Sequence, residues 1–151
     1  THLKYCRKLI IDKLEFENYL NKVMELLLHY PEINTVSIER QTFSGADVKF
    51  LQERISNHPL LRNRDINFIN KNRTKNKDNR IDAIIPEINL RRVMFNEDDA
   101  EAIEQVESFA GANYTANDDA IDSLADALEY ITTINPPLPK LKLYRLSDFG
   151  F

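Results

Sequence analysis

Acidic side chains gather at one point of the sequence, where a helix is expected to begin. The segment 117–128 reads NDDAIDSLADAL, and Asp118, Asp119 and Asp122 stand at its start. A further acid, Glu39, ends a short β-branched run that has the composition of a buried strand. Carboxylates on rigid elements can hold two divalent ions about 4 Å apart, which is the arrangement of a two-metal nuclease. The pattern therefore suggests phosphodiester hydrolysis.

The same acids also have an ordinary interpretation. On a helical projection Asp119, Asp122 and Asp126 fall nearly opposite the apolar positions, as in an amphipathic helix with a solvated acidic face. Acids in a first turn also interact favourably with the helix dipole. Glu39 could simply pair with a neighbouring basic residue. The projection leaves open which of Asp118 and Asp119 would be the main metal ligand.

A basic segment, 71–80, reads KNRTKNKDNR and contains no apolar side chain. Lysine and arginine supply most of the non-specific affinity for DNA, so this segment is a candidate for phosphate contacts. Its position after an expected strand would place it at the same sheet edge as Glu39. The alternative is a solvated loop. The candidate DNA-binding residues are Lys71, Arg73, Lys75, Lys77 and Arg80.

Composition narrows the class of protein. The chain has 151 residues, 42% of them hydrophobic, which fits one globular domain, and no apolar run is long enough to cross a bilayer. With one cysteine, Cys6, an intrachain disulfide and a cysteine-rich zinc site are excluded. With 3 glycines no Walker loop can be built. The net charge is −4, but the charges are unevenly distributed along the sequence, because 97–129 holds 11 acids and no lysine or arginine.

Hydrophobic periodicity predicts strands that alternate with helices. This alternation favours an α/β fold with parallel strand pairing. In such sheets, sites form at the carboxyl ends of strands, where Glu39 is expected to lie. The expected strands are 3–12, 33–39, 65–70 and 91–95, and the expected helices are 15–30, 44–55, 78–88, 97–110 and 118–132.

Several residues predict where these helices begin or break. Ser44 is a plausible N-cap for the second helix, Asp78 for the third and Asn96 for the fourth. Pro86 lies inside the third expected helix, so that helix is expected to split or kink there.

The order of these motifs resembles the C-terminal nuclease domain of phage terminase large subunits, the DNA-packaging motors of tailed phages. The resemblance rests on 36–39 (VSIE), on 77–81 (KDNRI) and on 117–124 (NDDAIDSL), and it covers most of the chain. It implies a fold similar to ribonuclease H and the Holliday-junction resolvases, in which helices flank a mixed sheet. It also implies a nuclease domain at 1–135 and an extended C-terminal tail at 136–151.

The resemblance assigns roles to the acids. The spacing in the related resolvases selects Glu39, Asp119 and Asp122 as catalytic metal ligands, with Asp118 beside them. In the family such acids bind Mg²⁺ or Mn²⁺ and cut concatemeric double-stranded DNA. The implied partners are double-stranded DNA, the portal protein and the terminase small subunit, in the host cytoplasm at the portal vertex of the procapsid.

The chain also departs from the family pattern. The first catalytic aspartate of the family lies on the opening strand of the sheet, whereas Asp12 ends a segment that resembles the third strand. The sequence is therefore expected to begin inside the domain, and this portion alone could be inactive. Two other readings stay open. One is a non-catalytic module that binds DNA or a portal protein, and the other is a different ribonuclease H-like nuclease, such as a resolvase or transposase.

Overall fold

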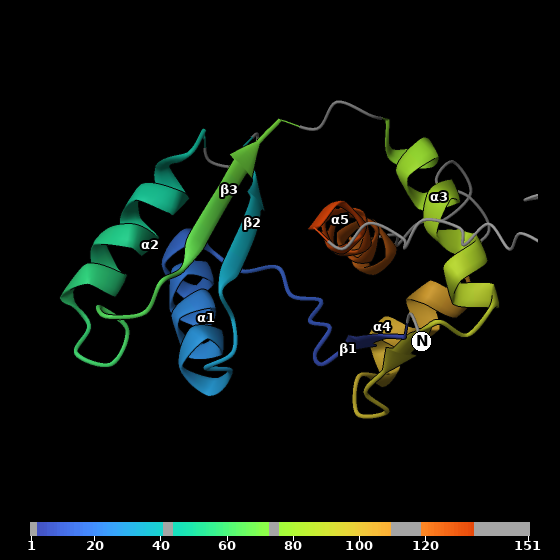
Figure 1. Ribbon diagram of the computed structural model, residues 1–151, viewed down its shortest axis with the longest axis horizontal. Coiled ribbons are helices and arrows are strands. Elements are labelled where there is room, and N and C mark those ends of the chain that lie inside the picture. The colour runs from blue at the N-terminus through green and yellow to red at the C-terminus, as the bar shows by residue number, and fades with distance from the viewer. Residues whose placement is uncertain (1–2, 41–43, 73–75, 110–118, 135–151) are drawn as a thin grey trace, which may run out of the picture.

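A computed structural model describes residues 3–40, 44–72, 76–109 and 119–134 of the chain. Helices and strands alternate along most of these ranges, which confirms the α/β class (Figure 1). The strands are β1 (Lys4–Cys6), β2 (Thr35–Glu39), β3 (Asn67–Lys71) and β4 (Val93–Phe95). The helices are α1 (Phe16–His29), α2 (Ala46–Asn57), α3 (Lys77–Asn89), α4 (Ala100–Glu107) and α5 (Asp119–Ile134).

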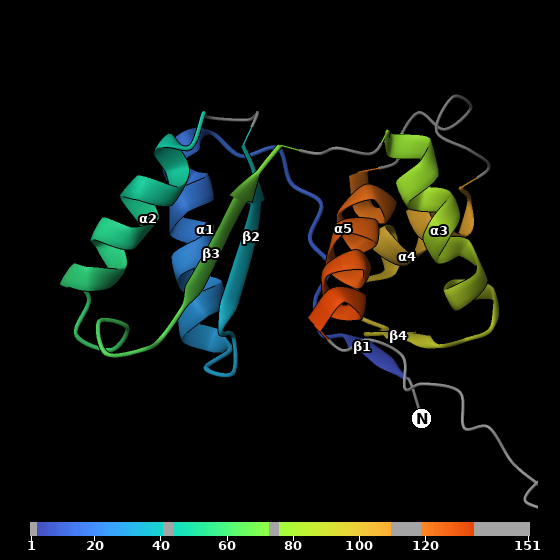
Figure 2. The same ribbon diagram turned by 45° about the horizontal axis from the view of Figure 1, so that its top comes forward.

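Both strand pairs are parallel, as expected. β2 pairs with β3, so that Val36 lies opposite Phe68 and Glu39 lies opposite Lys71, and β1 pairs with β4. The described strands form two separate two-stranded sheets, whereas one mixed sheet was expected. Figure 1 shows the β2–β3 pair beside α1 and α2, and Figure 2 shows the β1–β4 pair near α4.

The β2–β3 pair has its own hydrophobic core. Parallel strands cannot be joined by a hairpin, and here α2 forms the crossover between them. Leu27 of α1, Ile55 of α2 and Leu61 are buried together, and Val36 and Phe68 pack against them from the strands. This packing holds the two strands in register.

A second core joins α3, α4 and α5. Ile81 and Ile84 of α3 are buried against Ile121 and Leu124 of α5, and Val106 of α4 belongs to the same cluster. Burying one such side chain stabilises a fold by roughly 1.5–3 kcal/mol. The apolar stripe of α5 predicted from the sequence is therefore confirmed as a core face. None of the described helices is both long and apolar enough to span a membrane.

Two helix starts differ from the prediction. Gly45, not Ser44, is the N-cap of α2, and it has a φ of 85°. Asn76, not Asp78, is the N-cap of α3, and its side chain accepts a hydrogen bond from the Asn79 N–H at 2.8 Å.

Two further details of the helices also differ. α3 continues through Pro86 without a break, so the expected split is wrong, although proline still removes one backbone donor. α4 begins at Ala100 with Asp99 at its N-cap position, later than the start expected from Asn96. Asn96 instead accepts a hydrogen bond from the Asp98 N–H at 3.1 Å, which closes a turn before the helix.

Candidate functional site

Glu39 is the last residue of β2, as the sequence predicted, and Lys71 is the last residue of β3. Their Cα atoms are paired across the two strands, so an acid and a base end neighbouring parallel strands at one edge. Next to them, the Asn70 Nδ2 donates to the Ile38 carbonyl oxygen at 3.2 Å, which ties the ends of the strands together. This edge is where parallel α/β sheets usually form sites.

The start of α2 closes on the same edge. Ser44 and Gly45 both have left-handed backbone conformations, with φ of 54° and 85°. A Cβ atom on Gly45 would lie 3.1 Å from the Asn70 Oδ1, so the absence of a side chain lets the loop approach β3.

A buried carboxylate fixes this helix start. Asp47, in the first turn of α2, is 1% exposed, and its Oδ2 accepts a hydrogen bond from the Tyr19 hydroxyl at 3.3 Å. Its Oδ1 accepts from the Val48 N–H at 2.9 Å. Burial, and then the charge and hydrogen bond of Asp47, hold the pKa of the Tyr19 hydroxyl well above its usual value. The pair therefore links α1 to α2 and serves a structural purpose.

α5 approaches β2 from the other side. The Thr35 Oγ1, at the start of β2, lies 3.5 Å from the Tyr130 hydroxyl in the second half of α5. Figure 1 views α5 almost along its axis while β2 lies along the page, and Figure 2 shows the same helix tilted, so α5 crosses the direction of β2. In the first turn of α5, the Ala120 N–H donates to the Gln105 Oε1 of α4 at 3.4 Å.

Asp118 lies outside the described residues, and of Asp119 only the backbone is described.

Asp122 has a different environment from the one predicted. It is 8% exposed and lies against Arg80 of α3, with its Oδ1 2.9 Å from the Arg80 Nη2. The Arg80 Nη1 donates to the Asp126 Oδ1 at 2.6 Å. The acidic face of α5 is thus covered by α3 at these positions and is not solvated. Asp122, which the resemblance selects as a metal ligand, therefore has a buried guanidinium beside one of its oxygens.

Sequence reasoning missed this ion-pair cluster, which consists of Arg80, Asp122 and Asp126. The sequence predicts that Arg80 ends an exposed basic segment, which either contacts DNA or is solvated, yet Arg80 is only 6% exposed. A signal was present, because Arg80 precedes Ile84 by one helical turn and so borders the apolar face of its own helix. Asp122 and Asp126 have the same spacing on the facing helix.

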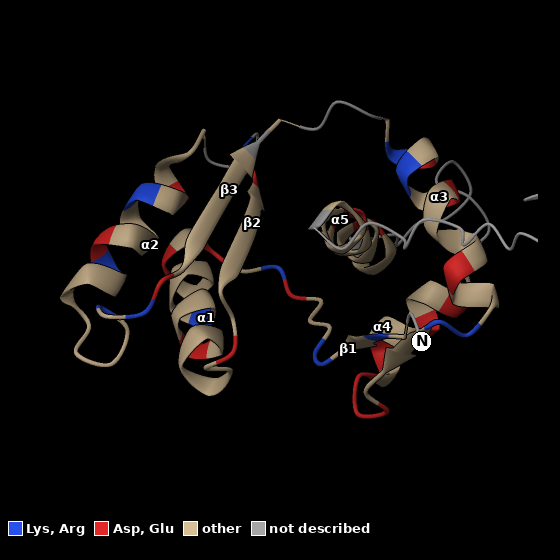
Figure 3. Ribbon diagram, viewed as in Figure 1, with Lys and Arg blue, Asp and Glu red and all other residues tan. Residues whose placement is uncertain are grey.

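Two more of the predicted DNA-binding residues lie at element ends. Lys71 is the last residue of β3, and Lys77 is the first residue of α3. Figure 3 shows lysine and arginine at the start of α3 and acids farther along the helix. Arg73 and Lys75 lie outside the described residues. The burial of Arg80 counts against its predicted contact with DNA.

Glu39 supplies one carboxylate at this edge, the kind of ligand that Mg²⁺ and Mn²⁺ prefer. Asp119, the second predicted acid, begins α5. Within the described ranges, no three His, Cys, Asp or Glu side chains converge as a metal site would need. The donors that the sequence adds to Glu39 lie at 118–119, whose side chains fall outside those ranges.

A second buried carboxylate supports α4. The Asp99 Oδ2 accepts from the Leu9 N–H at 2.7 Å, and its Oδ1 pairs with the Lys8 ammonium. Burial would raise the pKa of Asp99, but the hydrogen bonds from Lys8 and Leu9 and the charge of Lys8 outweigh it and lower the pKa. This pair joins the segment after β1 to the start of α4.

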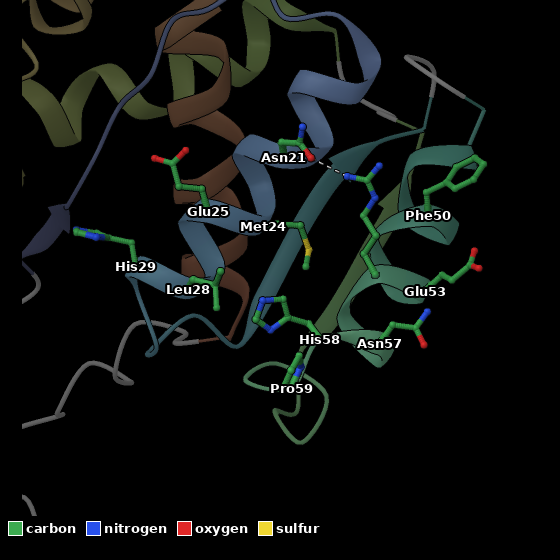
Figure 4. A pocket seen from close by; sticks show the side chains of 11 residues that line it. Asn21, Met24, Glu25, Leu28, His29, Phe50, Glu53, Asn57, His58 and Pro59 are labelled. Carbon is green, nitrogen blue, oxygen red and sulfur yellow. Dashed lines mark hydrogen bonds between the residues drawn. The ribbon is translucent and has the colours of Figure 1, made fainter.

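The outer faces of α1 and α2 enclose a groove of about 970 Å³ (Figure 4). Its floor is partly apolar, and the Arg54 Nη1 donates to the Asn21 Oδ1 across it at 2.9 Å. None of the predicted site residues lines it. The lining side chains are Asn21, Met24, Glu25, Leu28, His29, Phe50, Glu53, Arg54, Asn57, His58 and Pro59.

Comparisons of this chain with protein-family models, with curated proteins and with solved structures find no match.

Proposed function

We propose that this chain is a metal-dependent endonuclease domain of the ribonuclease H-like type, from the large subunit of a phage DNA-packaging terminase. One observation carries the proposal. Glu39 ends β2 beside Lys71 of the parallel strand β3, and α5, which begins at Asp119, contacts β2 where the Thr35 Oγ1 lies 3.5 Å from the Tyr130 hydroxyl. The parallel β2–α2–β3 unit is consistent with a fold of this kind.

In this proposal Glu39, Asp118 and Asp119 hold two Mg²⁺ or Mn²⁺ ions. Bound there, such ions lower the pKa of a coordinated water and stabilise the leaving oxygen of a phosphodiester. Glu39 is held at the end of a paired strand, which limits the movement of its carboxylate. The backbone of Asp119 is placed by the packing of α5 against α3 and α4.

The basic segment would hold the substrate. Lys71 lies opposite Glu39 and Lys77 begins α3, and with Arg73 and Lys75 they would neutralise phosphates of double-stranded DNA. By the same resemblance, the portal protein and the terminase small subunit are the proposed protein partners. The proposed place of action is the portal vertex of the procapsid in the host cytoplasm.

The basic segment alone also supports a second candidate, a module that binds DNA without cutting it. This candidate predicts salt-sensitive binding that does not depend on the acids. Each phosphate contact that is lost with Lys71→Ala or Lys77→Ala should reduce the slope of log K against log salt by about 0.9. The nuclease proposal predicts the same slopes, so cleavage must separate the two candidates.

The separating experiment is cleavage of supercoiled plasmid by the full-length protein with Mn²⁺. Asp119→Ala should remove cleavage without unfolding the protein, whereas Glu107→Ala, at an exposed acid on α4, should leave it unchanged. Equal cleavage by the parent and by folded Asp119→Ala protein would refute the assignment. DNA binding by the parent without any cleavage would favour the binding module.

A further inference from the structure

We propose that the groove between α1 and α2, called the α1–α2 groove below, binds an amphipathic helix of a partner protein whose apolar face is flanked by lysine or arginine. None of the residues proposed for DNA cleavage lines this groove. The inference therefore concerns a second interaction of the chain and does not depend on the proposed nuclease function.

The walls of the α1–α2 groove are two helix faces. On each helix the lining residues recur at i, i+3, i+4 and i+7, the spacing of a single face. On α1 they are Asn21, Met24, Glu25 and Leu28, and on α2 they are Phe50, Glu53, Arg54 and Asn57. Each wall is about 10 Å long, at about 1.5 Å per residue. The groove therefore follows both helices for about two turns.

Contacts between α1 and α2 hold the walls in place. The Arg54 Nη1 donates to the Asn21 Oδ1 at 2.9 Å, and the Arg54 Nη2 donates to the Glu17 Oε2 at 2.6 Å. The rings of Phe16 and Phe50 pack edge to face, with their centroids 5.8 Å apart. A partner would therefore meet a groove that is already formed.

Apolar side chains remain exposed along the groove. Leu28 is 41% exposed and Phe50 is 47% exposed. Met24 lies between the two helices (Figure 4), and the flexible thioether of methionine adapts to irregular apolar surfaces. Covering these side chains would remove apolar area from water, which is the main source of affinity at such contacts.

The backbone of the walls limits the kind of partner that fits. The N–H and C=O groups within α1 and α2 bond inside their own helices, so the walls offer side chains as contacts. An extended segment pressed against them would bury backbone donors and acceptors without partners, which is costly. A helix satisfies its own backbone and places apolar residues in such a groove at i, i+3 or i+4, and i+7.

The charge of the groove selects the sign of the partner. Glu25 and Glu53 are exposed on opposite walls, whereas Arg54, the cationic lining residue, pairs with Glu17. Lys22 lies 3.4 Å from Glu25, but an exposed ion pair of this kind contributes little. The two carboxylates attract lysine and arginine and repel phosphate, so the groove fits a basic protein helix and not DNA.

The test measures binding of three synthetic peptides to the full-length protein by isothermal titration calorimetry. The first peptide has leucines on one helical face over three turns, flanked by lysines. The second has glutamate in place of each lysine. The third contains the residues of the first in an order that spreads the leucines around the helix. Backbone amide chemical shifts locate the bound peptide on the protein.

The lysine peptide should bind roughly tenfold more tightly than the glutamate peptide, the combined effect of a few exposed charge contacts. Salt should reduce this difference. Combining Glu25→Lys with Glu53→Lys should reverse the preference. Glu104→Lys combined with Glu107→Lys, at exposed acids of α4, is the matched control and should retain it.

The apolar contacts are tested separately. Leu28→Ser combined with Phe50→Ser should weaken binding of the lysine peptide by roughly 10–100-fold, because two partly exposed side chains no longer become buried. Leu90→Ser, at a residue that is 60% exposed outside the groove, should leave the affinity unchanged. Circular dichroism establishes that each variant is folded.

Three results would overturn the inference. Equal binding of the lysine and glutamate peptides, or of the ordered and reordered peptides, would show that the groove does not select a basic amphipathic helix. Self-association of the protein that Phe50→Ser abolishes would identify a second copy as the occupant. Tighter peptide binding by Leu141→Ser would identify segment 136–151, which lies outside the described residues, as the occupant. Plasmid cleavage tests the proposed nuclease independently of these results.

Discussion

The hydroxyl oxygens of Thr35 and Tyr130 lie 3.5 Å apart and join the start of β2 to the second half of α5. Residues 95 positions apart in the sequence are thereby related in space. The contact places α5, the helix that begins at Asp119, beside the strand that ends at Glu39.

Loss of the hydroxyl contact should have a small, measurable effect. Tyr130→Phe removes one partner of a long hydrogen bond, so we expect the free energy of unfolding to fall by about 0.5 kcal/mol, near the low end for such bonds. Urea denaturation measures this change. Tyr5→Phe is the matched control, because Tyr5 is 69% exposed and its hydroxyl is expected to contribute nothing. An equal loss in both variants would contradict the contact.

Replacing Arg80 alone should destabilise the protein more than replacing the whole ion-pair cluster by apolar residues. Arg80→Met removes the guanidinium that lies 2.9 Å from the buried Asp122, and we expect the free energy of unfolding to fall by about 3–5 kcal/mol. Combining it with Asp122→Leu and Asp126→Leu should recover most of that loss, since an all-apolar cluster needs no counter-charge. Chemical denaturation checks both. Additive losses in the combined variant would contradict this account.

Acid should weaken the link between the segment after β1 and α4. The pKa of Asp99 is lower in the folded protein than in the unfolded chain, so the unfolded chain binds more protons and stability rises with pH. The contribution is complete above the unfolded value, about 3.9, and is lost as the pH falls through the folded pKa. Asp99→Asn should remove this part of the acid dependence of unfolding, whereas Asp98→Asn, at an exposed neighbour, should retain it.

In the turn before α2, we expect a side chain to be tolerated at position 44 but not at position 45. Gly45→Ala places a Cβ at a φ of 85° and 3.1 Å from the Asn70 Oδ1, and we expect a loss of about 1–2 kcal/mol in stability. Ser44→Gly, at a φ of 54°, should be neutral or stabilising because it relieves a left-handed serine. Thermal unfolding of the two variants measures the contrast. A loss of stability in both would contradict the backbone conformation.

Much of the scaffold of the site could be predicted from the sequence. The β-branched run ending in Glu39, its parallel pairing and the apolar face of α5 follow from local patterns of one or two elements. The shift of the N-cap from Ser44 to Gly45 could not be predicted, because it depends on how closely the loop approaches Asn70.

The environment of Asp122 could not be predicted either. A helical projection separates the apolar face of α5 from the acidic face, but it cannot show that Arg80 of another helix covers the acids. Likewise, the strand pattern predicts parallel pairing but not which strands pair. For this reason one sheet was expected, whereas the described strands form two small sheets.

The most direct test of the central claim is cleavage of supercoiled plasmid with Mn²⁺ by the full-length protein and by Glu39→Gln, Asp119→Asn and the double variant. If the two acids act as one metal site, each single variant should lose about as much activity as the double variant, because residues that act as a unit are not additive. Folded single variants that cut as fast as the parent would contradict the account.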